Sequence, residues 1–315
     1  MSEPDNYPKK NDSKATVFVR RLSSTVVLLG VVLGGLLCGG AVSVSLVGGL
    51  IMLLNIVGLL EFYGMVKENQ LPRFKWLGIA GGVLLLGAVF LYLSGLAAKL
   101  LGLNPPTIAG VAELEIALLA VFLVVVSVRR VFVHPAPPSF SINGGTVLGV
   151  LYVSWLLCFV LKIFFYPVPE NAAFDGGVCL LFFILATKCS DIGAYLLGSL
   201  IGRHKMIPKV SPGKTWEGFA GAIVLSTAVA LVFAHYFGET KLGGMTLLHA
   251  ALLGPLLAVG AVVGDLVESV FKRDSGVKDS GAFFPGIGGI LDLLDSLLFN
   301  APLMFLYLRL FLFND

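Results

Sequence analysis

Long apolar stretches follow one another along most of this chain, and short connections between them carry most of the charged residues. A helix that spans a bilayer needs roughly 20 mostly apolar residues. Windows of this kind cover 22 to 40, 42 to 64, 76 to 95, 112 to 128, 145 to 164, 178 to 201, 217 to 237, 247 to 271 and 289 to 311. The pattern predicts an all-α, polytopic transmembrane bundle of about nine spanning helices.

The polar and apolar stretches also divide the chain into three parts. We expect a disordered cytoplasmic arm over 1 to 15, N-terminal transmembrane helices over 16 to 175, and a C-terminal transmembrane catalytic region with cytoplasmic loops over 176 to 315. Arg20 and Arg21 precede the first apolar window, as in a signal peptide. No clear small-residue cleavage site closes that window, so we interpret it as the first helix.

Lysine and arginine are distributed unevenly between alternate connections, and this distribution predicts the topology. Seventeen of the 22 basic residues fall in one set of segments, and only Lys99, Lys162 and Lys241 fall in the other. Positively charged segments are retained on the cytoplasmic side during insertion. The partition therefore predicts an odd number of helices, with the N-terminus inside and the C-terminus outside.

The composition agrees with the helical pattern and excludes several classes of protein. The chain is 57% hydrophobic and 13% charged, with a mean hydropathy of +0.93, which excludes an ordinary soluble domain. Its four cysteines lie in apolar segments without metal-ligand or disulfide spacing. The net charge of +3 includes no long basic run, so we expect no nucleic-acid partner.

The connection from 202 to 218 has the residue types of a phosphate-binding surface. It reads G-R-H-K-M-I-P-K-V-S-P-G-K-T-W-E-G, in which Lys209 and Lys214 supply charge and Ser211 and Thr215 supply hydroxyls. A helix that begins near Thr215 would add the positive end of its dipole. Pro208 stands where a P-loop needs glycine, which excludes that motif. The alternative is that these cations serve only as a topological anchor.

Asp191 lies within the sixth apolar window, three residues after Lys188. Ionisable residues inside a membrane segment are costly and usually face the bundle interior or a wet cavity. Asp191 is therefore a candidate functional residue. An ion pair between Asp191 and Lys188 that serves only packing is the alternative.

The densest group of candidate residues is near the C-terminus. Asp265, Glu268 and Ser269 form D-x-x-E-S at the end of the eighth window, and Asp292, Asp295 and Ser296 form D-x-x-D-S at the start of the ninth. Each motif places two carboxylates on one helical face. The connection between them also contains Lys272, Arg273, Lys278, Asp274 and Asp279.

Four carboxylates that converge near a membrane repel one another unless a cation neutralises them, and their hard oxygen atoms suit Mg²⁺ or Ca²⁺. With neighbouring lysines, such a site has what phosphoryl or nucleotidyl transfer requires. The alternative is that the acids pair with nearby Lys and Arg residues and cap the helices.

These motifs resemble the phosphatidate cytidylyltransferase, or CDP-diacylglycerol synthase, family. The first half of its signature, S-x-x-K-R-x-x-x-x-K-D, is matched by Ser269, Lys272, Arg273, Lys278 and Asp279, followed by Gly281. The second half, P-G-H-G-G-x-x-D-R-x-D, is matched by Pro285, Gly286, Gly288, Gly289, Asp292 and Asp295. Two positions depart from the family pattern: Ile287 stands in place of His, and Leu293 in place of Arg.

The resemblance implies that CTP and phosphatidate react to give CDP-diacylglycerol and pyrophosphate, with Mg²⁺ alone or with a second cation. It implies that Asp265 and Asp292 hold the metal, and that Lys272, Glu268 and Asp295 are further catalytic residues. The substrate-binding residues would be Asp191, Lys209, Ser211, Lys214, Thr215, Glu217, Ser269, Arg273, Lys278 and Asp279. The resemblance also implies a homodimer in the cell (inner) membrane, with the site facing the cytoplasm.

Three other functions stay open from the sequence alone. A CTP-dependent lipid or polyprenol kinase would transfer the γ-phosphoryl group instead of CMP. An ion-coupled transporter would use Lys188 and Asp191 as a relay. A non-catalytic member of the family would have lost activity through Ile287 and Leu293.

Overall fold

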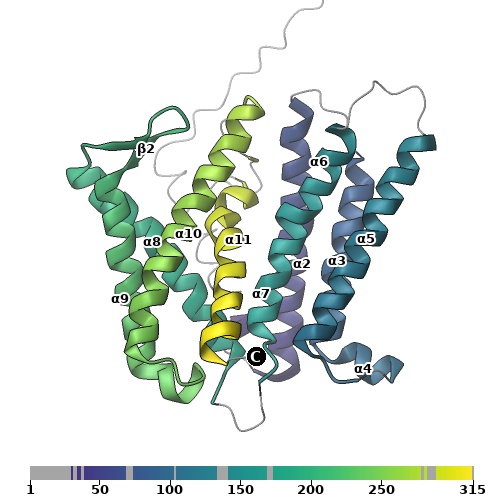
Figure 1. The fold of residues 1–315 in the computed structure, drawn as a ribbon, viewed down its shortest axis with the longest axis horizontal. Coiled ribbons are helices and arrows are strands. Elements are labelled where there is room, and N and C mark those ends of the chain that lie inside the picture. The colour runs from purple at the N-terminus through teal and green to yellow at the C-terminus, as the bar shows by residue number, and fades with distance from the viewer. Residues whose placement is uncertain are drawn as a thin grey trace, which may run out of the picture.

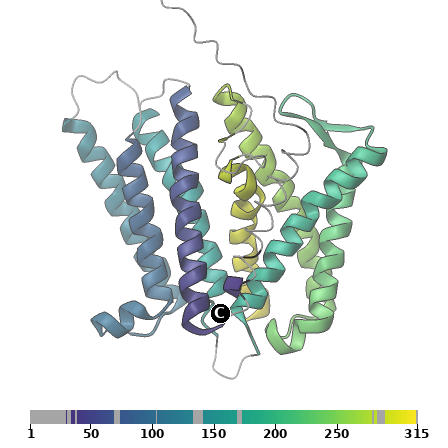
Figure 2. The same ribbon diagram turned by 180° about the vertical axis from the view of Figure 1, so that it is seen from behind.

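The computed structural model describes residues 30, 34–36, 39–68, 74–102, 104–132, 141–168, 173–277, 280–281 and 289–313. Long helices dominate this part of the chain and lie side by side in a bundle (Figures 1 and 2). In chain order the elements are α2 (Gly40–Glu68), α3 (Lys75–Leu93), α4 (Leu96–Leu101), α5 (Ile108–Phe132), α6 (Ser141–Gly149), η1 (Val150–Trp155), α7 (Leu156–Phe164), α8 (Gly176–Ile201), β1 (Lys205–Ile207), β2 (Ser211–Thr215), α9 (Trp216–Lys241), α10 (Leu247–Asp274), α11 (Ile290–Tyr307) and η2 (Leu308–Leu312).

The described residues contain 8 helices long and apolar enough to cross a membrane. They coincide with the second to ninth windows of the sequence analysis, with α6, η1 and α7 together forming one span of 22 residues. This confirms the predicted polytopic helical bundle. The first window, 22 to 40, falls mostly outside the described residues, so the total of nine spans and the orientation stay predictions.

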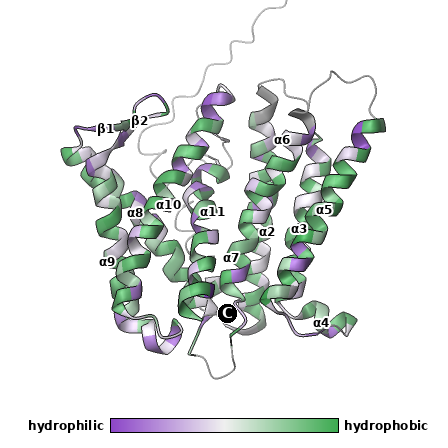
Figure 3. Ribbon diagram, viewed as in Figure 1, coloured by the Kyte–Doolittle hydropathy of each residue, from purple (hydrophilic) through white to green (hydrophobic). Residues whose placement is uncertain are grey.

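The helices form two groups joined by α11. One group contains α2, α3, α5 and α7, and the other contains α8, α9 and α10. Helix α11 lies between them, because it contacts α10 and α8 on one side and α7 and α2 on the other (Figure 1). Hydrophobic residues cover most of the length of the helices, and hydrophilic residues concentrate near several of their ends (Figure 3). Since lipid cannot satisfy backbone N–H and C=O groups, helices that satisfy their own groups are the expected solution.

Glycines let the four C-terminal helices approach each other closely in two pairs. A Cβ atom on Gly193 of α8 would lie 2.3 Å from the carbonyl oxygen of Gly221 on α9. A Cβ on Gly264 of α10 would lie 2.6 Å from the carbonyl oxygen of Asp295 on α11. Small residues at such crossings are typical of helix packing in membranes. The second contact brings the acidic ends of α10 and α11 together.

A buried ion pair connects α5 to α7 in the N-terminal group. The Lys162 amine lies 2.6 Å from a Glu115 carboxylate oxygen, and both side chains are buried. The Trp155 indole donates a second hydrogen bond to the same oxygen at 3.2 Å. Lys162, which we expect in a connection from the sequence, lies within the last turn of α7. Its charge is tolerated there because Glu115 neutralises it.

Other differences from the sequence prediction concern short elements. Strands β1 and β2 form an antiparallel hairpin within the basic connection, with Lys205 opposite Thr215, where we predicted only a loop. Helix α4 is a single short helix between spans, where we predicted a connection around Lys99. Strand β1 has three residues, β2 has five and α4 has six. Their hydrophobic patterns are too short to be recognised in a sequence.

Candidate functional site

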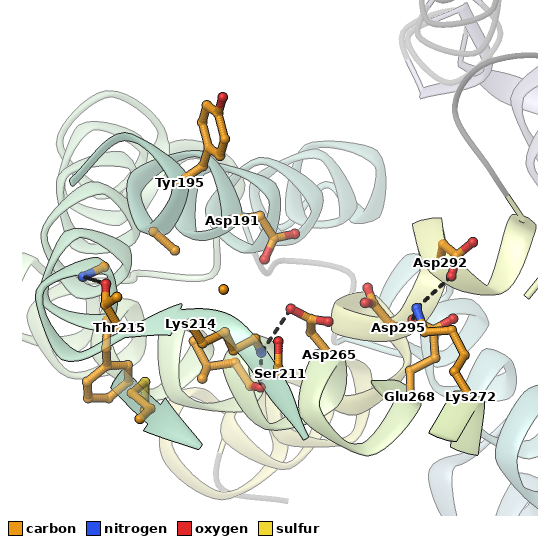
Figure 4. A pocket seen from close by; sticks show the side chains of 16 residues that line it. Asp191, Tyr195, Ser211, Lys214, Thr215, Asp265, Glu268, Lys272, Asp292 and Asp295 are labelled. Carbon is orange, nitrogen blue, oxygen red and sulfur yellow. Dashed lines mark hydrogen bonds and ion pairs between the residues drawn. The ribbon is translucent and has the colours of Figure 1, made fainter. Parts of the chain in front are cut away.

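A cavity of about 600 Å³ lies beside the β1–β2 hairpin (Figure 4). Its walls come from α8, β1, β2, the first turn of α9, the last turns of α10 and the first two turns of α11. The volume lies in the range of small-molecule sites. Nine of the predicted site residues line it: Asp191, Ser211, Lys214, Thr215, Asp265, Glu268, Lys272, Asp292 and Asp295.

Three carboxylates form the centre of this cavity. Asp265 and Glu268 lie one turn apart on α10, and Asp295 comes from α11 across the close contact at Gly264. One carboxylate oxygen from each lies within 4.8 Å of the others. Glu268 is 1% exposed and Asp295 is 8% exposed. The fold thus concentrates negative charge where little water is available to screen it.

The chemistry of this cluster fits a divalent cation. Neither carboxylate oxygen of Glu268 has a hydrogen-bond partner among the described residues, although both oxygens are buried. The Lys272 amine, 3.3 Å from Oε2, is the nearby cation, and a buried carboxylate that accepts no hydrogen bond is costly. Hard carboxylate oxygens in a group of three are the ligands that Mg²⁺ and Ca²⁺ prefer. Asp265, Glu268 and Asp295 are therefore the described residues that a metal ion would fit.

Two lysines neutralise part of the charge from opposite sides. The Lys214 amine lies 2.8 Å from Asp265 Oδ2 and donates to the Val262 carbonyl oxygen at 2.8 Å. The Lys272 amine lies 2.8 Å from Asp292 Oδ1 and 3.3 Å from Glu268 Oε2. Both amines therefore face the cavity in which an anionic substrate would lie (Figure 4).

Asp292 has a different environment from the three clustered acids. Besides Lys272, it accepts the backbone N–H of Gly289 at 2.9 Å, which caps the N-terminus of α11. The sequence predicted Asp292 as the second metal ligand beside Asp265. In the described structure Asp292 lines the same cavity but is not part of the three-carboxylate group. Its role as a metal ligand stays a prediction.

The hairpin brings the predicted phosphate-binding residues to the rim of the cavity. The Thr215 hydroxyl accepts the backbone N–H of Gly218 at 3.1 Å and so caps α9, which begins at Trp216. This agrees with the helix that we predicted near Thr215. Ser211 and Lys214 lie on β2 and face the cavity (Figure 4). The cavity thus has an α9 N-terminus, a hydroxyl and a cation on one wall.

Asp191 belongs to a polar network that links α8 to α11. The Lys188 amine lies 3.4 Å from Asp191 Oδ2 and donates to Ser296 Oγ at 2.9 Å. Ser296 Oγ in turn donates to Asp191 Oδ2 at 3.1 Å. The ion pair with Lys188 is therefore present, as one of our two alternatives required. Asp191 also lines the cavity, and its role in substrate binding stays a prediction.

The remaining predicted residues are not among the described residues that line the cavity. Lys209 is exposed, and Arg273 donates to the Val210 carbonyl oxygen at 3.4 Å. Glu217 accepts the backbone N–H groups of Arg203 and His204, just before β1, and contacts the His204 ring at 2.6 Å. Ser269 is half-buried on α10. Lys278, Asp279 and Ile287 lie outside the described residues.

Glu61 of α2 supports the site from outside the C-terminal motifs. Its Oε2 atom accepts the backbone N–H of Leu291 at 3.0 Å and lies 3.5 Å from the Ser280 hydroxyl. A Cβ on Gly281 would lie 2.3 Å from Glu61 Oε1, so a larger residue there would displace the Glu61 carboxylate. Glu61 therefore fixes the start of α11, one residue before Asp292. In the sequence, the only sign of this role is an acidic residue near the end of an apolar helix.

Comparisons with known proteins point to one family. A model of the cytidylyltransferase family matches residues 19–311. A phosphatidate cytidylyltransferase of Haemophilus influenzae is 42% identical over 123 residues, which are 39% of this chain and 43% of that protein. The uncharacterized protein YnbB of Escherichia coli is 43% identical over 129 residues, or 41% of this chain and 42% of that protein.

A phosphatidate cytidylyltransferase of Staphylococcus haemolyticus is 44% identical over 125 residues, which are 40% of this chain and 46% of that protein. Each of these matches covers less than half of the relative's length.

Proposed function

Because this chain belongs to the cytidylyltransferase family, we propose that it transfers the CMP moiety of CTP to phosphatidate, giving CDP-diacylglycerol and pyrophosphate. One observation carries the proposal. Buried carboxylates on α10 and α11 and the lysines Lys214 and Lys272 face one cavity at an end of a membrane bundle. There a water-soluble nucleotide and a lipid headgroup can meet.

The reaction needs positioning and charge stabilisation more than covalent chemistry from the protein. A phosphate oxygen of phosphatidate attacks the α-phosphorus of CTP, and the bond from that phosphorus to the β-phosphate oxygen breaks. Pyrophosphate leaves with the electron pair of the broken bond. The lipid phosphate is already anionic at neutral pH, so no side chain has to act as a nucleophile or remove its proton.

The side chains of the cavity divide this work. Lys214, Ser211 and the N-terminus of α9 would bind the phosphates of CTP from the hairpin side. Lys272 would stabilise the negative charge that builds up during transfer, and Asp292 and Glu268 orient its amine.

A divalent ion completes this arrangement, and we propose Mg²⁺. Asp265, Glu268 and Asp295 are the residues that would hold it, because their oxygens are close together and those of Glu268 lack hydrogen-bond partners among the described residues. When bound, the ion would neutralise negative charge on the phosphates of the substrates. Without the ion, the negative charge of the three carboxylates would repel both anionic substrates.

The same proposal places the protein in the cell (inner) membrane with the cavity toward the cytoplasm. Lys75, Arg129, Lys205 and Lys214 lie on elements at the cavity end of the molecule, and basic segments stay on the cytoplasmic side. CTP is a cytoplasmic nucleotide, so the cavity would face its supply. A homodimer, implied by the family resemblance, is a further prediction, which chemical cross-linking in membranes would check.

The decisive experiment is an assay with purified protein, phosphatidate, MgCl₂ and CTP labelled at either the α- or the γ-phosphorus. We expect the α-label in CDP-diacylglycerol and the γ-label in pyrophosphate. A γ-label in the lipid would instead show a CTP-dependent kinase. If thermal denaturation shows that the protein is folded and neither label enters lipid, cytidylyl transfer is contradicted.

A further inference from the structure

A second cavity, of about 250 Å³, lies between α2, α7, α8 and α11. Its walls are leucine, isoleucine, valine, phenylalanine and glycine, with one exception. Lys188 is the only charged residue that lines it in the part of the chain that the structure describes. The Lys188 amine lies 3.4 Å from Asp191 Oδ2, so its charge is neutralised while its methylene groups line the apolar wall.

Along α8, Lys188 lies between the residues that line the two cavities. On α8 the apolar cavity is lined by Phe183 and Ile184, which precede Lys188, and the polar cavity by Asp191 and Tyr195, which follow it. The Lys188 amine lies 2.9 Å from Ser296 Oγ and 3.4 Å from Asp191 Oδ2. Asp191 belongs to the wall of the polar cavity. Lys188 therefore stands at the boundary between a charged compartment and an apolar one.

The order of the cavities along the bundle matches the shape of a phospholipid. Helix α8 runs toward the hairpin end, so its residues before Lys188 lie farther from that end than Asp191 and Tyr195 do (Figure 1). The apolar cavity thus lies on the side of the membrane interior. A phospholipid in the adjacent leaflet has its phosphate near the surface and its acyl chains directed toward the midplane.

We infer that Lys188 binds the phosphate of the lipid substrate and that the apolar cavity takes one of its acyl chains. The inference rests on the proposed function and specifies the lipid half of its site. Charge and position select the occupant, because the ammonium group of Lys188 has three N–H donors and Ser296 and Asp191 take two of them, which leaves one donor for an anionic lipid headgroup. Leu293 lines the same cavity, so an aliphatic residue directly after Asp292 keeps this compartment apolar.

The acyl-chain part is tested by filling the cavity without changing its charge. Ile184→Trp adds bulk one turn before Lys188, and Ile192→Trp, at a 51% exposed position of the same helix, is the matched control. Displacing several methylenes should raise KM for dipalmitoyl phosphatidate about tenfold or more in Ile184→Trp. KM of Ile184→Trp for water-soluble dihexanoyl phosphatidate should stay near the wild-type value. KM of Ile192→Trp should stay near wild type for both lipids. An equal change for both substrates, or none, would overturn this assignment.

The phosphate part is tested by removing the cation and returning it from another wall. Lys188→Leu should raise KM for phosphatidate about tenfold or more while KM for CTP is unchanged, because a charged hydrogen bond to the lipid is lost. Lys188→Leu combined with Leu293→Arg places a cation in the same cavity and should recover a large part of that loss. Equal rises of both KM values, or no recovery from the arginine, would contradict phosphate binding by Lys188.

A binding readout separates this inference from the proposed reaction. In nanodiscs, dipalmitoyl phosphatidate should raise the melting temperature of the wild type more than dipalmitoylglycerol does. Lys188→Leu should remove that difference, and the added arginine should restore it. If the wild type shows this pattern but makes no CDP-lipid, the proposed reaction fails and the lipid site stands. If phosphatidate gives no difference in an active enzyme, the lipid site fails.

Discussion

At the scale of single residues, neighbours in the sequence decide where a carboxylate points, and neighbours in space decide what it does. Asp265 and Glu268 share a helical face because they are three residues apart. The same spacing places Asp292 and Asp295 on α11, yet these two have different partners. Asp295 joins the three-carboxylate group, whereas Asp292 binds Lys272 and the backbone of Gly289.

This difference leads to a prediction about metal dependence. Asp265→Asn should lower kcat about 100-fold or more and raise the Mg²⁺ concentration needed for half-maximal activity, because a direct ligand is lost. If Asp292 is also a ligand, Asp292→Asn should shift that concentration in the same way. If Asp292 acts only through Lys272 and the start of α11, its variant should lose activity at an unchanged Mg²⁺ midpoint.

A Mg²⁺ titration of initial rates at saturating CTP measures both variants. Asp274→Asn is the control, because Asp274 is an exposed acid at the end of the same helix. A fully active Asp265→Asn protein would contradict the metal assignment.

At the scale of elements, the site depends on how closely helices approach each other. The glycine contacts between α8 and α9 and between α10 and α11 set the positions of Asp191, the hairpin and Asp295. Close backbone approach is a main source of helix association in membranes, since lipid provides no hydrophobic drive between helices. Glu61 adds a polar contact that fixes the start of α11 from α2.

The close contact of α8 and α9 predicts the effect of a larger side chain. Gly193→Leu should destabilise the protein by about 1–3 kcal/mol or more, because its Cβ would overlap the Gly221 carbonyl and the helices would have to separate. Gly49→Leu, on a part of α2 with nothing within 4 Å of the added Cβ, is the control. Thermal denaturation in detergent compares the two, and equal melting temperatures would contradict the packing argument.

At the scale of the whole molecule, α11 joins two helix groups and places the charged cavity at one end of the bundle. The basic hairpin lies at that end, and Lys99 of α4 lies at the other (Figures 1 and 2). This separation is what a membrane with a positively charged cytoplasmic face produces.

The predicted orientation can be checked by labelling single cysteines in intact cells. In a background with the native cysteines replaced by serine, Lys99→Cys should react with a membrane-impermeant maleimide from outside. Lys209→Cys in the exposed hairpin connection should react only after the membrane is permeabilised. The opposite pattern would place the cavity outside and contradict use of cytoplasmic CTP.

Much of the architecture was predictable because a membrane imposes strong constraints on sequence. A spanning helix must be long and apolar, so eight windows in the described part of the chain coincide with observed spans. Helical spacing also determined that Asp265 and Glu268 share a face, and the motifs around Ser269 and Asp292 identified the family. These features depend on residues close together in the chain.

Only the tertiary structure decided which distant side chains meet. It placed Asp295 rather than Asp292 with Asp265 and Glu268, directed Lys214 from the hairpin to Asp265, and set Glu61 against the start of α11. It also put Lys188 between a polar and an apolar cavity. Such pairings depend on close glycine contacts between different helices, and spacing along one helix does not encode them.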